Sequence, residues 1–182
     1  MCSVEESLCR LFFYCAHEEN ELGSMEGLRG IRSILLRELE LIVEPLGLKV
    51  VELSVHRGKS GLNIYVVVYR DGGVTLGDCE RVTRLYNDRL TILEPIDENN
   101  YTLQVSSPGT ERVFKDVKEY DLFRSRHVTM VVDSSIEGSE GGVISGILEG
   151  LEKGHVILRT EGKAGTKIVI PMESVRKTRL SG

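Results

Sequence analysis

Hydrophobic positions in the first half of the chain predict a helix followed by a β-hairpin. From Met25 onward, apolar residues recur at steps of three and four, which is typical of one face of an amphipathic helix ending near Pro45. Two β-rich runs follow, residues 49–56 and 62–70, and the glycines of the RGKSG sequence between them predict a turn. The second run is apolar on both faces, which is typical of a central strand.

A second helix and a third strand complete this half of the chain. Thr75, followed by Asp78, resembles a helix N-cap with an acidic residue in the first turn. Apolar positions from Cys79 to Leu93 keep the helical spacing, and residues 101–106 alternate as a strand does. The order α-β-β-α-β predicts a layer of helices on a small sheet, as a domain of residues 25–107.

The second half consists of short β-rich pieces separated by glycines. After a short helix at residues 116–123, five strands are predicted at 127–133, 143–149, 155–160, 167–170 and 175–180, with hairpin loops at 137–142 and 161–165. This spacing predicts a small β-barrel of Sm-like or SH3-like type over residues 108–182. The predicted fold class is therefore α+β, with a two-layer N-terminal domain and a C-terminal β-barrel.

The sequence SSPGTER joins the two predicted domains, and its residue types restrict the backbone conformation more than those of any other segment in the chain. Proline fixes its own φ, and Pro-Gly suits the two central positions of a type II turn, which needs a positive φ at the glycine. The segment has two interpretations: an interdomain joint whose Glu and Arg pair internally, or a contact with a partner. Its candidate residues are Ser106, Ser107, Pro108, Gly109, Glu111 and Arg112.

Composition and charge limit the classes of function. The chain has 182 residues, of which 41% are hydrophobic and 28% charged, as in an ordinary globular protein. No apolar run approaches the roughly 20 residues of a membrane span. The four cysteines form no Cys-x-x-Cys pair, which favours a reduced, cytoplasmic protein. The net charge of −5 favours a basic protein partner over nucleic acid alone.

The first 24 residues stand apart from this pattern. They lack a clear hydrophobic period and carry five glutamates against one arginine, a net charge of −4. We expect residues 1–24 to be an N-terminal extension, with Met25 as an alternative start of the protein.

No arrangement of residues predicts catalysis or metal binding. There is no Gly-x-Ser-x-Gly elbow, and no motif places any of the four histidines. Cys15 and His17 are residue types that bind metals, but no second pair of such residues accompanies them. The glycine-rich stretches lack the phosphate-binding Gly-x-x-x-x-Gly-Lys pattern. The sequence therefore predicts no enzyme, no cofactor and no metal site.

Three stretches together resemble the bacterial ribosome maturation factor RimP family: VSSPGTER after a strand, GVTLGDCERVTR at the second helix, and the tail IPMESVRKTRL. The resemblance extends from Met25 to about Leu180. It implies a KH-like N-terminal domain, an Sm-like C-terminal barrel, and a role in small ribosomal subunit assembly through a basic small-subunit ribosomal protein. The family usually has SSPG-Leu-Asp-Arg-Pro-Leu, whereas Thr110 and Glu111 precede Arg112 here.

The resemblance suggests further contacts, each beside a structural alternative. Asp78 and Glu80 either face the basic partner or cap their helix. Arg176, Lys177 and Arg179 either contact phosphates of small-subunit rRNA or lie on a solvated strand. We expect a monomeric, non-catalytic assembly factor in the cytoplasm that binds the small ribosomal subunit. The alternative is a stand-alone RNA-binding module, which a steep salt dependence on naked rRNA would favour.

Overall fold

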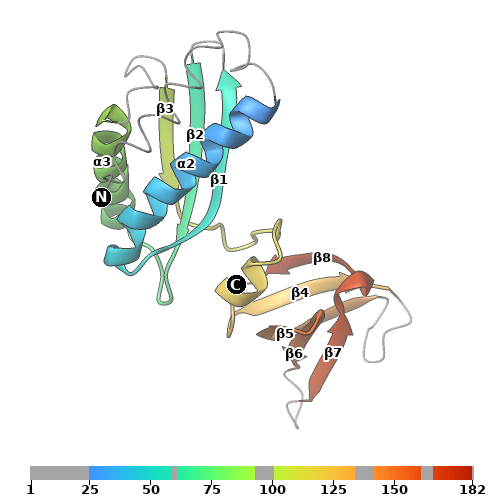
Figure 1. Ribbon diagram of the computed structural model, residues 1–182. Helices are drawn as coiled ribbons and strands as arrows, with labels where there is room; N and C mark the ends of the chain where they lie inside the picture. The colour runs from blue at the N-terminus through green and yellow to red at the C-terminus, as the bar shows by residue number, and fades with distance from the viewer. Residues whose placement is uncertain (1–24, 59–60, 93–100, 134–141, 161–165, 182) are drawn as a thin grey trace, which may run out of the picture. The chain divides into compact units, whose positions relative to one another are not determined.

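The computed structural model describes residues 25–58, 61–92, 101–133, 142–160 and 166–181, and it divides into two compact units between Ser107 and Pro108 (Figure 1). The predicted extension at residues 1–24 and the predicted loop at 161–165 lie outside the described residues, as does nearly all of the loop at 137–142. No described helix is both long and apolar enough to cross a membrane.

The first unit has two helices and a three-stranded sheet, in the predicted order. Helix α2 (Met25–Val43) and a 3-10 turn (Glu44–Leu46) precede β1 (Lys49–Gly58) and β2 (Gly61–Tyr69), and α3 (Leu76–Ile92) precedes β3 (Tyr101–Ser106). Strand β2 lies in the middle, antiparallel to β1 and parallel to β3. The central position predicted for the second run is therefore confirmed.

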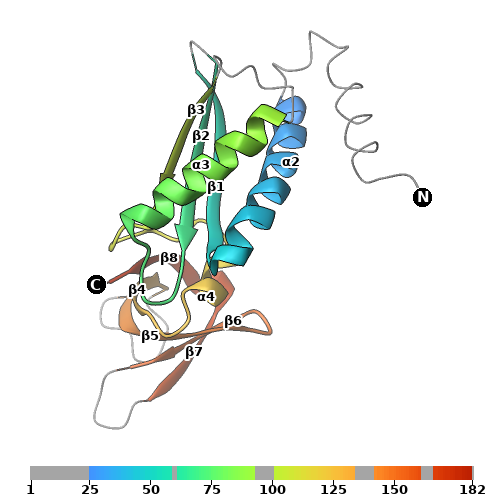
Figure 2. The same cartoon turned by 90° about the vertical axis from the view of Figure 1, so that its left-hand side faces the viewer.

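Both helices cover one face of this sheet (Figure 2). Alternate residues of β2, Ile64, Val66 and Val68, are completely buried beneath them. The hydroxyl of Tyr86 on α3 donates a hydrogen bond of 2.8 Å to the Leu35 carbonyl on α2, and burial raises the pKa of this tyrosine. These contacts fix α3 against α2 on this face of the sheet.

The second unit is a short helix and a five-stranded antiparallel sheet. Helix α4 (Glu119–Leu122) is followed by β4 (His127–Val132), β5 (Val143–Glu152), β6 (His155–Arg159), β7 (Lys167–Pro171), a 3-10 turn (Met172–Ser174) and β8 (Val175–Leu180). The strand order is β7-β6-β5-β4-β8. The rings of Phe114, Tyr120 and Phe123 pack together, with centroids 5.1 and 5.2 Å apart.

The predicted β-barrel is not confirmed, because the described strands form an open sheet whose edges are β7 and β8. The outer edge of β8 pairs instead with the segment that precedes α4. Val113 forms a bridge with Arg179, and the Phe114 amide donates to the Thr178 carbonyl at 2.9 Å. The α+β class is confirmed by both units.

Candidate functional site

The segment after β3 turns later than the sequence predicts. A hydrogen bond of 3.1 Å runs from the Arg112 amide to the Gly109 carbonyl, so Thr110 and Glu111 occupy the centre of the turn. Gly109 is not among the glycines with positive φ, so the predicted type II Pro-Gly turn is wrong. The later turn brings the Arg112 carbonyl within 2.9 Å of the Leu180 amide on β8.

Arg112 forms a buried ion pair inside the second unit. Its Nε lies 2.6 Å from Oε2 of Glu119 and its Nη2 lies 3.1 Å from Oε1, and the two side chains are 9% and 1% exposed. The Lys115 and Asp116 amides also donate to Oε1 of Glu119, at 3.0 and 3.3 Å. The guanidinium therefore holds the incoming segment against α4, which favours a structural role.

The other residues of the segment are less constrained. Glu111 contacts Arg179 at 3.6 Å, so the predicted pairing of Glu111 with Arg112 is wrong. The Ser106 hydroxyl lies 3.5 Å from the Val66 carbonyl, at the limit of a hydrogen bond, and Ser107 is exposed. A joint between the units and a contact with a partner both stay predictions for these serines.

Asp78 caps helix α3, as the alternative interpretation proposed. Its Oδ2 accepts hydrogen bonds from the amide and the hydroxyl of Thr75, at 2.9 and 2.7 Å, and its own amide donates to that hydroxyl at 3.1 Å. Arg70 contacts the same oxygen at 2.7 Å. The Thr75 hydrogen bonds, with a smaller contribution from Arg70, lower the pKa of Asp78. This carboxylate is thus occupied by its own unit.

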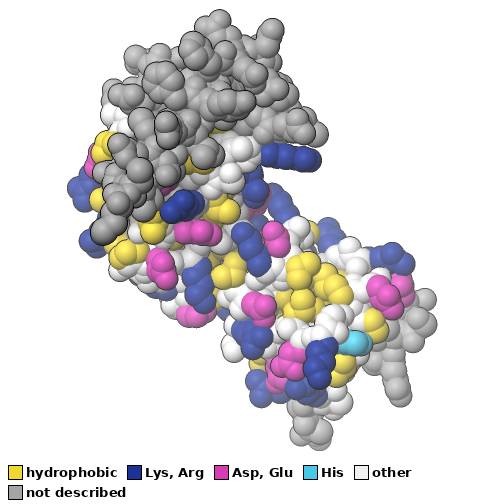
Figure 3. Space-filling view, viewed as in Figure 1, with side chains coloured by type: hydrophobic (Ala, Val, Ile, Leu, Met, Phe, Trp, Pro, Cys, Tyr) yellow, Lys and Arg dark blue, Asp and Glu magenta, His cyan; other side chains and the backbone are white. Residues whose placement is uncertain are grey.

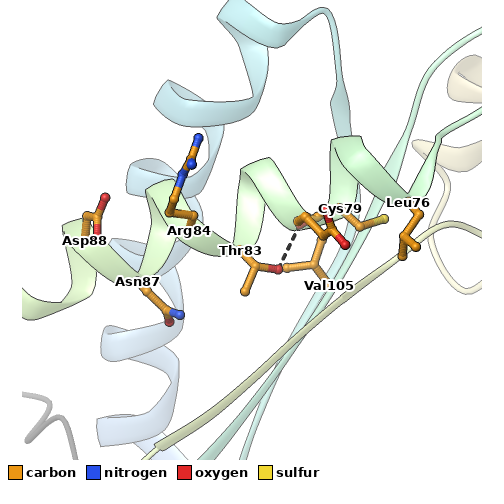
Figure 4. Close-up of a pocket in the computed structure, with 8 residues that line it drawn as sticks. Leu76, Cys79, Thr83, Arg84, Asn87, Asp88 and Val105 are labelled. Carbon is orange, nitrogen blue, oxygen red and sulfur yellow. Dashed lines mark hydrogen bonds between the residues drawn. The ribbon is translucent and has the colours of Figure 1, made fainter.

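Glu80, two residues further on, belongs to a different feature. A groove of about 490 Å³ runs between α3 and β3 (Figure 4). Its lining residues come from α3, with one from β3: Leu76, Cys79, Glu80, Thr83, Arg84, Asn87, Asp88 and Val105. The groove has no signal in the sequence, because Val105 lies far from Cys79 and Thr83 along the chain and meets them only in the folded unit.

The groove has an apolar centre and a charged rim. Thr83 donates to the Cys79 carbonyl at 2.8 Å, and Val105 lies on the strand side of both residues in Figure 4. Burial, followed by the charge of Asp78, raises the pKa of the Cys79 thiol, so at neutral pH this cysteine is a small neutral group rather than a nucleophile. Glu80, Arg84 and Asp88 follow one another at steps of four along α3 and are exposed.

The basic residues of β8 mostly have acidic neighbours. Arg176 forms two hydrogen bonds to Asp133, at 2.8 and 3.1 Å, and Arg179 contacts Glu111. Lys177 is exposed on the same strand. On the face that Figure 3 shows, Lys and Arg side chains are interspersed with Asp and Glu side chains on both units. The described residues contain no cluster of three or more His, Cys, Asp or Glu that could hold a metal ion.

Comparison with known families gives a match in the first unit. Residues 38–111 match the family model described as the RimP N-terminal domain. The matched range begins in the last turns of α2, at Glu38, covers the three strands of the first sheet and α3, and ends at Glu111 within the turn after β3. This part of the chain is similar to the RimP N-terminal domain, and the resemblance to the RimP family is confirmed.

Proposed function

We propose that this protein is a non-catalytic assembly factor of the small ribosomal subunit, and that it binds a basic small-subunit ribosomal protein, its rRNA site, or both. The observation that carries the proposal is the match of residues 38–111 to the RimP N-terminal domain. The proposal places the protein in the cytoplasm, as a monomer without a cofactor.

The charges of the described residues favour a protein partner over naked RNA. Arg176 and Arg179 each lie beside a carboxylate of their own unit, so binding to phosphate would first require these pairs to separate. The acidic residues Glu80 and Asp88 lie exposed on the rim of the α3–β3 groove. A modest interface with charge complementarity speeds the encounter with a basic chain and still permits its release.

Gradient sedimentation of cell extracts tests this proposal. A tagged form of the protein should sediment with free small subunits and be absent from whole ribosomes, because an assembly factor leaves before subunits join. Equal amounts on both would contradict a role restricted to assembly.

The alternative, a stand-alone RNA-binding module, predicts a different salt dependence. Binding to naked small-subunit rRNA would then weaken steeply with salt, since each phosphate contact releases counterions. We expect weak binding to naked rRNA and firm binding to free small subunits at about 0.15 M salt. Tight binding to naked rRNA with a steep salt slope would favour the alternative.

A further inference from the structure

The four edges of the two sheets differ in how they are protected from pairing with another chain. Edge strands are usually blunted by lysines, prolines, bulges or a covering segment. Strand β1 has a bulge between Val50 and Glu52. Strand β7 carries Lys167 and ends in Pro171. The edge of β8 is covered by the backbone around Val113.

Within the part of the chain that the structure describes, strand β3 has none of these devices. Its sequence, YTLQVS, contains no charge, proline or glycine, and its register with β2 is regular over all six residues. Among the described strands it pairs with β2 alone. Its outer edge therefore presents peptide groups that can hydrogen-bond to an added strand.

The groove described above lies beside this edge. Val105 of β3 and the face of α3 that carries Cys79 and Thr83 line the same hollow (Figure 4). A sheet edge next to a helix is the arrangement in which an extended peptide adds as a strand and places alternate side chains between the strand and the helix. The hollow between α2 and α3, lined by Leu46 and Leu85 among others, includes no residue from a strand and so offers no such pairing.

We propose that the β3 edge and the α3–β3 groove bind an extended, basic peptide segment as a fourth strand of the first sheet. Backbone hydrogen bonds to β3 would hold the peptide, and alternate side chains would enter the groove. That the segment belongs to a ribosomal protein rests on the function proposed above; the binding mode rests on the edge and the groove.

The charges on the rim specify the peptide further. Glu80 and Asp88 give two carboxylates against the single guanidinium of Arg84. Eight residues of helix rise about 12 Å, and four residues of an extended strand span about 13 Å. Basic side chains four residues apart on one face of the added strand therefore match the two carboxylates, with a small apolar side chain between them opposite Cys79 and Val105.

A synthetic peptide tests the proposal with the full-length protein. The probe is acetyl-TKTVTKT-amide, in which the two lysines and the valine share one face. Its binding is followed by amide chemical shifts and hydrogen exchange. We expect saturable shifts in β3 and α3, together with slowed exchange at alternate residues within Tyr101–Ser106. N-methylation of three alternate peptide bonds removes the pairing on one side and should weaken binding at least tenfold.

Charge reversal on the rim of the α3–β3 groove provides a second test of the proposal. Glu80→Lys with Asp88→Lys should weaken binding of the lysine peptide about tenfold and should favour a matched peptide with glutamates in place of lysines. Both residues are exposed, so the fold should be unaffected. Glu173→Lys on the second unit, also exposed, is the matched control and should leave binding unchanged.

The results separate this inference from the proposed function. Each of three results would refute the proposal that the peptide adds as a strand. These are unaltered affinity of the N-methylated peptide, unaltered affinity after charge reversal at Glu80 and Asp88, and absence of binding at millimolar peptide. Sedimentation of the wild-type protein with free small subunits would still support an assembly role in that case. Peptide binding without any association with small subunits would retain the groove and refute the assembly role.

Discussion

Replacing Arg112 by methionine should destabilise the second unit strongly. The guanidinium forms two hydrogen bonds with the Glu119 carboxylate, at 2.6 and 3.1 Å, and the Lys115 and Asp116 amides donate to the same carboxylate. Methionine keeps much of the volume of the side chain and removes both hydrogen bonds. The carboxylate, 1% exposed, would lose its bond to the guanidinium and keep the hydrogen bonds from the Lys115 and Asp116 amides.

The burial of the Arg112–Glu119 ion pair decides how much the substitution lowers the free energy of unfolding. Removing one partner of a buried ion pair costs about 3–5 kcal/mol, because the other charge is left without compensation. The pair of Arg176 with Asp133 is the matched control: it has similar two-bond geometry in the same unit, but its side chains are 65% and 40% exposed. Arg176→Met should therefore lower the free energy of unfolding by only about 0–1 kcal/mol.

Native-state hydrogen exchange measures both variants within the intact chain. Amides of β4 and β5 report on the second unit, and amides of β2 serve as an internal reference because the two units need not unfold together. Adding Glu119→Gln to Arg112→Met should recover part of the loss, since a neutral amide oxygen still accepts the backbone hydrogen bonds. A loss below about 1 kcal/mol, or equal losses for the two arginines, would refute the role assigned to burial.

Two further predictions concern the turn and the helix cap. Gly109→Ala should leave the melting temperature unchanged, because an added Cβ meets nothing within 4 Å and the φ of Gly109 is not positive. Gly150→Ala should lower the melting temperature, because Gly150 has a φ of +130° and an added Cβ would lie 2.7 Å from Nε of Arg124. Equal effects of the two substitutions would contradict these backbone conformations. The lowered pKa of Asp78 means that its contribution to stability is present above about pH 4, the unfolded value, and is lost as pH falls through the folded value. Asp78→Asn should therefore speed amide exchange in α3 at pH 6 and reduce its acid dependence; an unchanged pH profile would contradict the cap.

The elements of the fold could be predicted from the sequence because each has a local signal. The three-and-four spacing behind Met25 depends only on the period of a helix, and Thr75 with Asp78 satisfies backbone donors within one turn. The closure of the second sheet has no local signal. Whether β8 pairs with β7 or with the segment at Val113 depends on contacts between residues far apart in the chain.

The candidate site was harder to predict for the same reason. The Pro-Gly dipeptide favours a type II turn by itself, but the hydrogen bond from the Leu180 amide to the Arg112 carbonyl requires a later turn. Glu119 lies seven residues after Arg112, and this spacing does not predict a contact where the intervening chain is not helical. Tertiary contacts in the second unit therefore outweigh the local preference of the dipeptide.

Two acidic residues at the start of α3, which the sequence analysis treats as one pair, have different surroundings in the structure. Asp78 and Glu80 are two residues apart and so project from different sides of the helix. The first faces Thr75 and Arg70 and stabilises the helix end, while the second faces solvent at the rim of the groove. We therefore propose that an acidic contact with a basic partner involves Glu80 and, two steps of four further along the same ridge, Asp88. Substitutions at Asp78 test the fold, and only substitutions along that ridge test recognition.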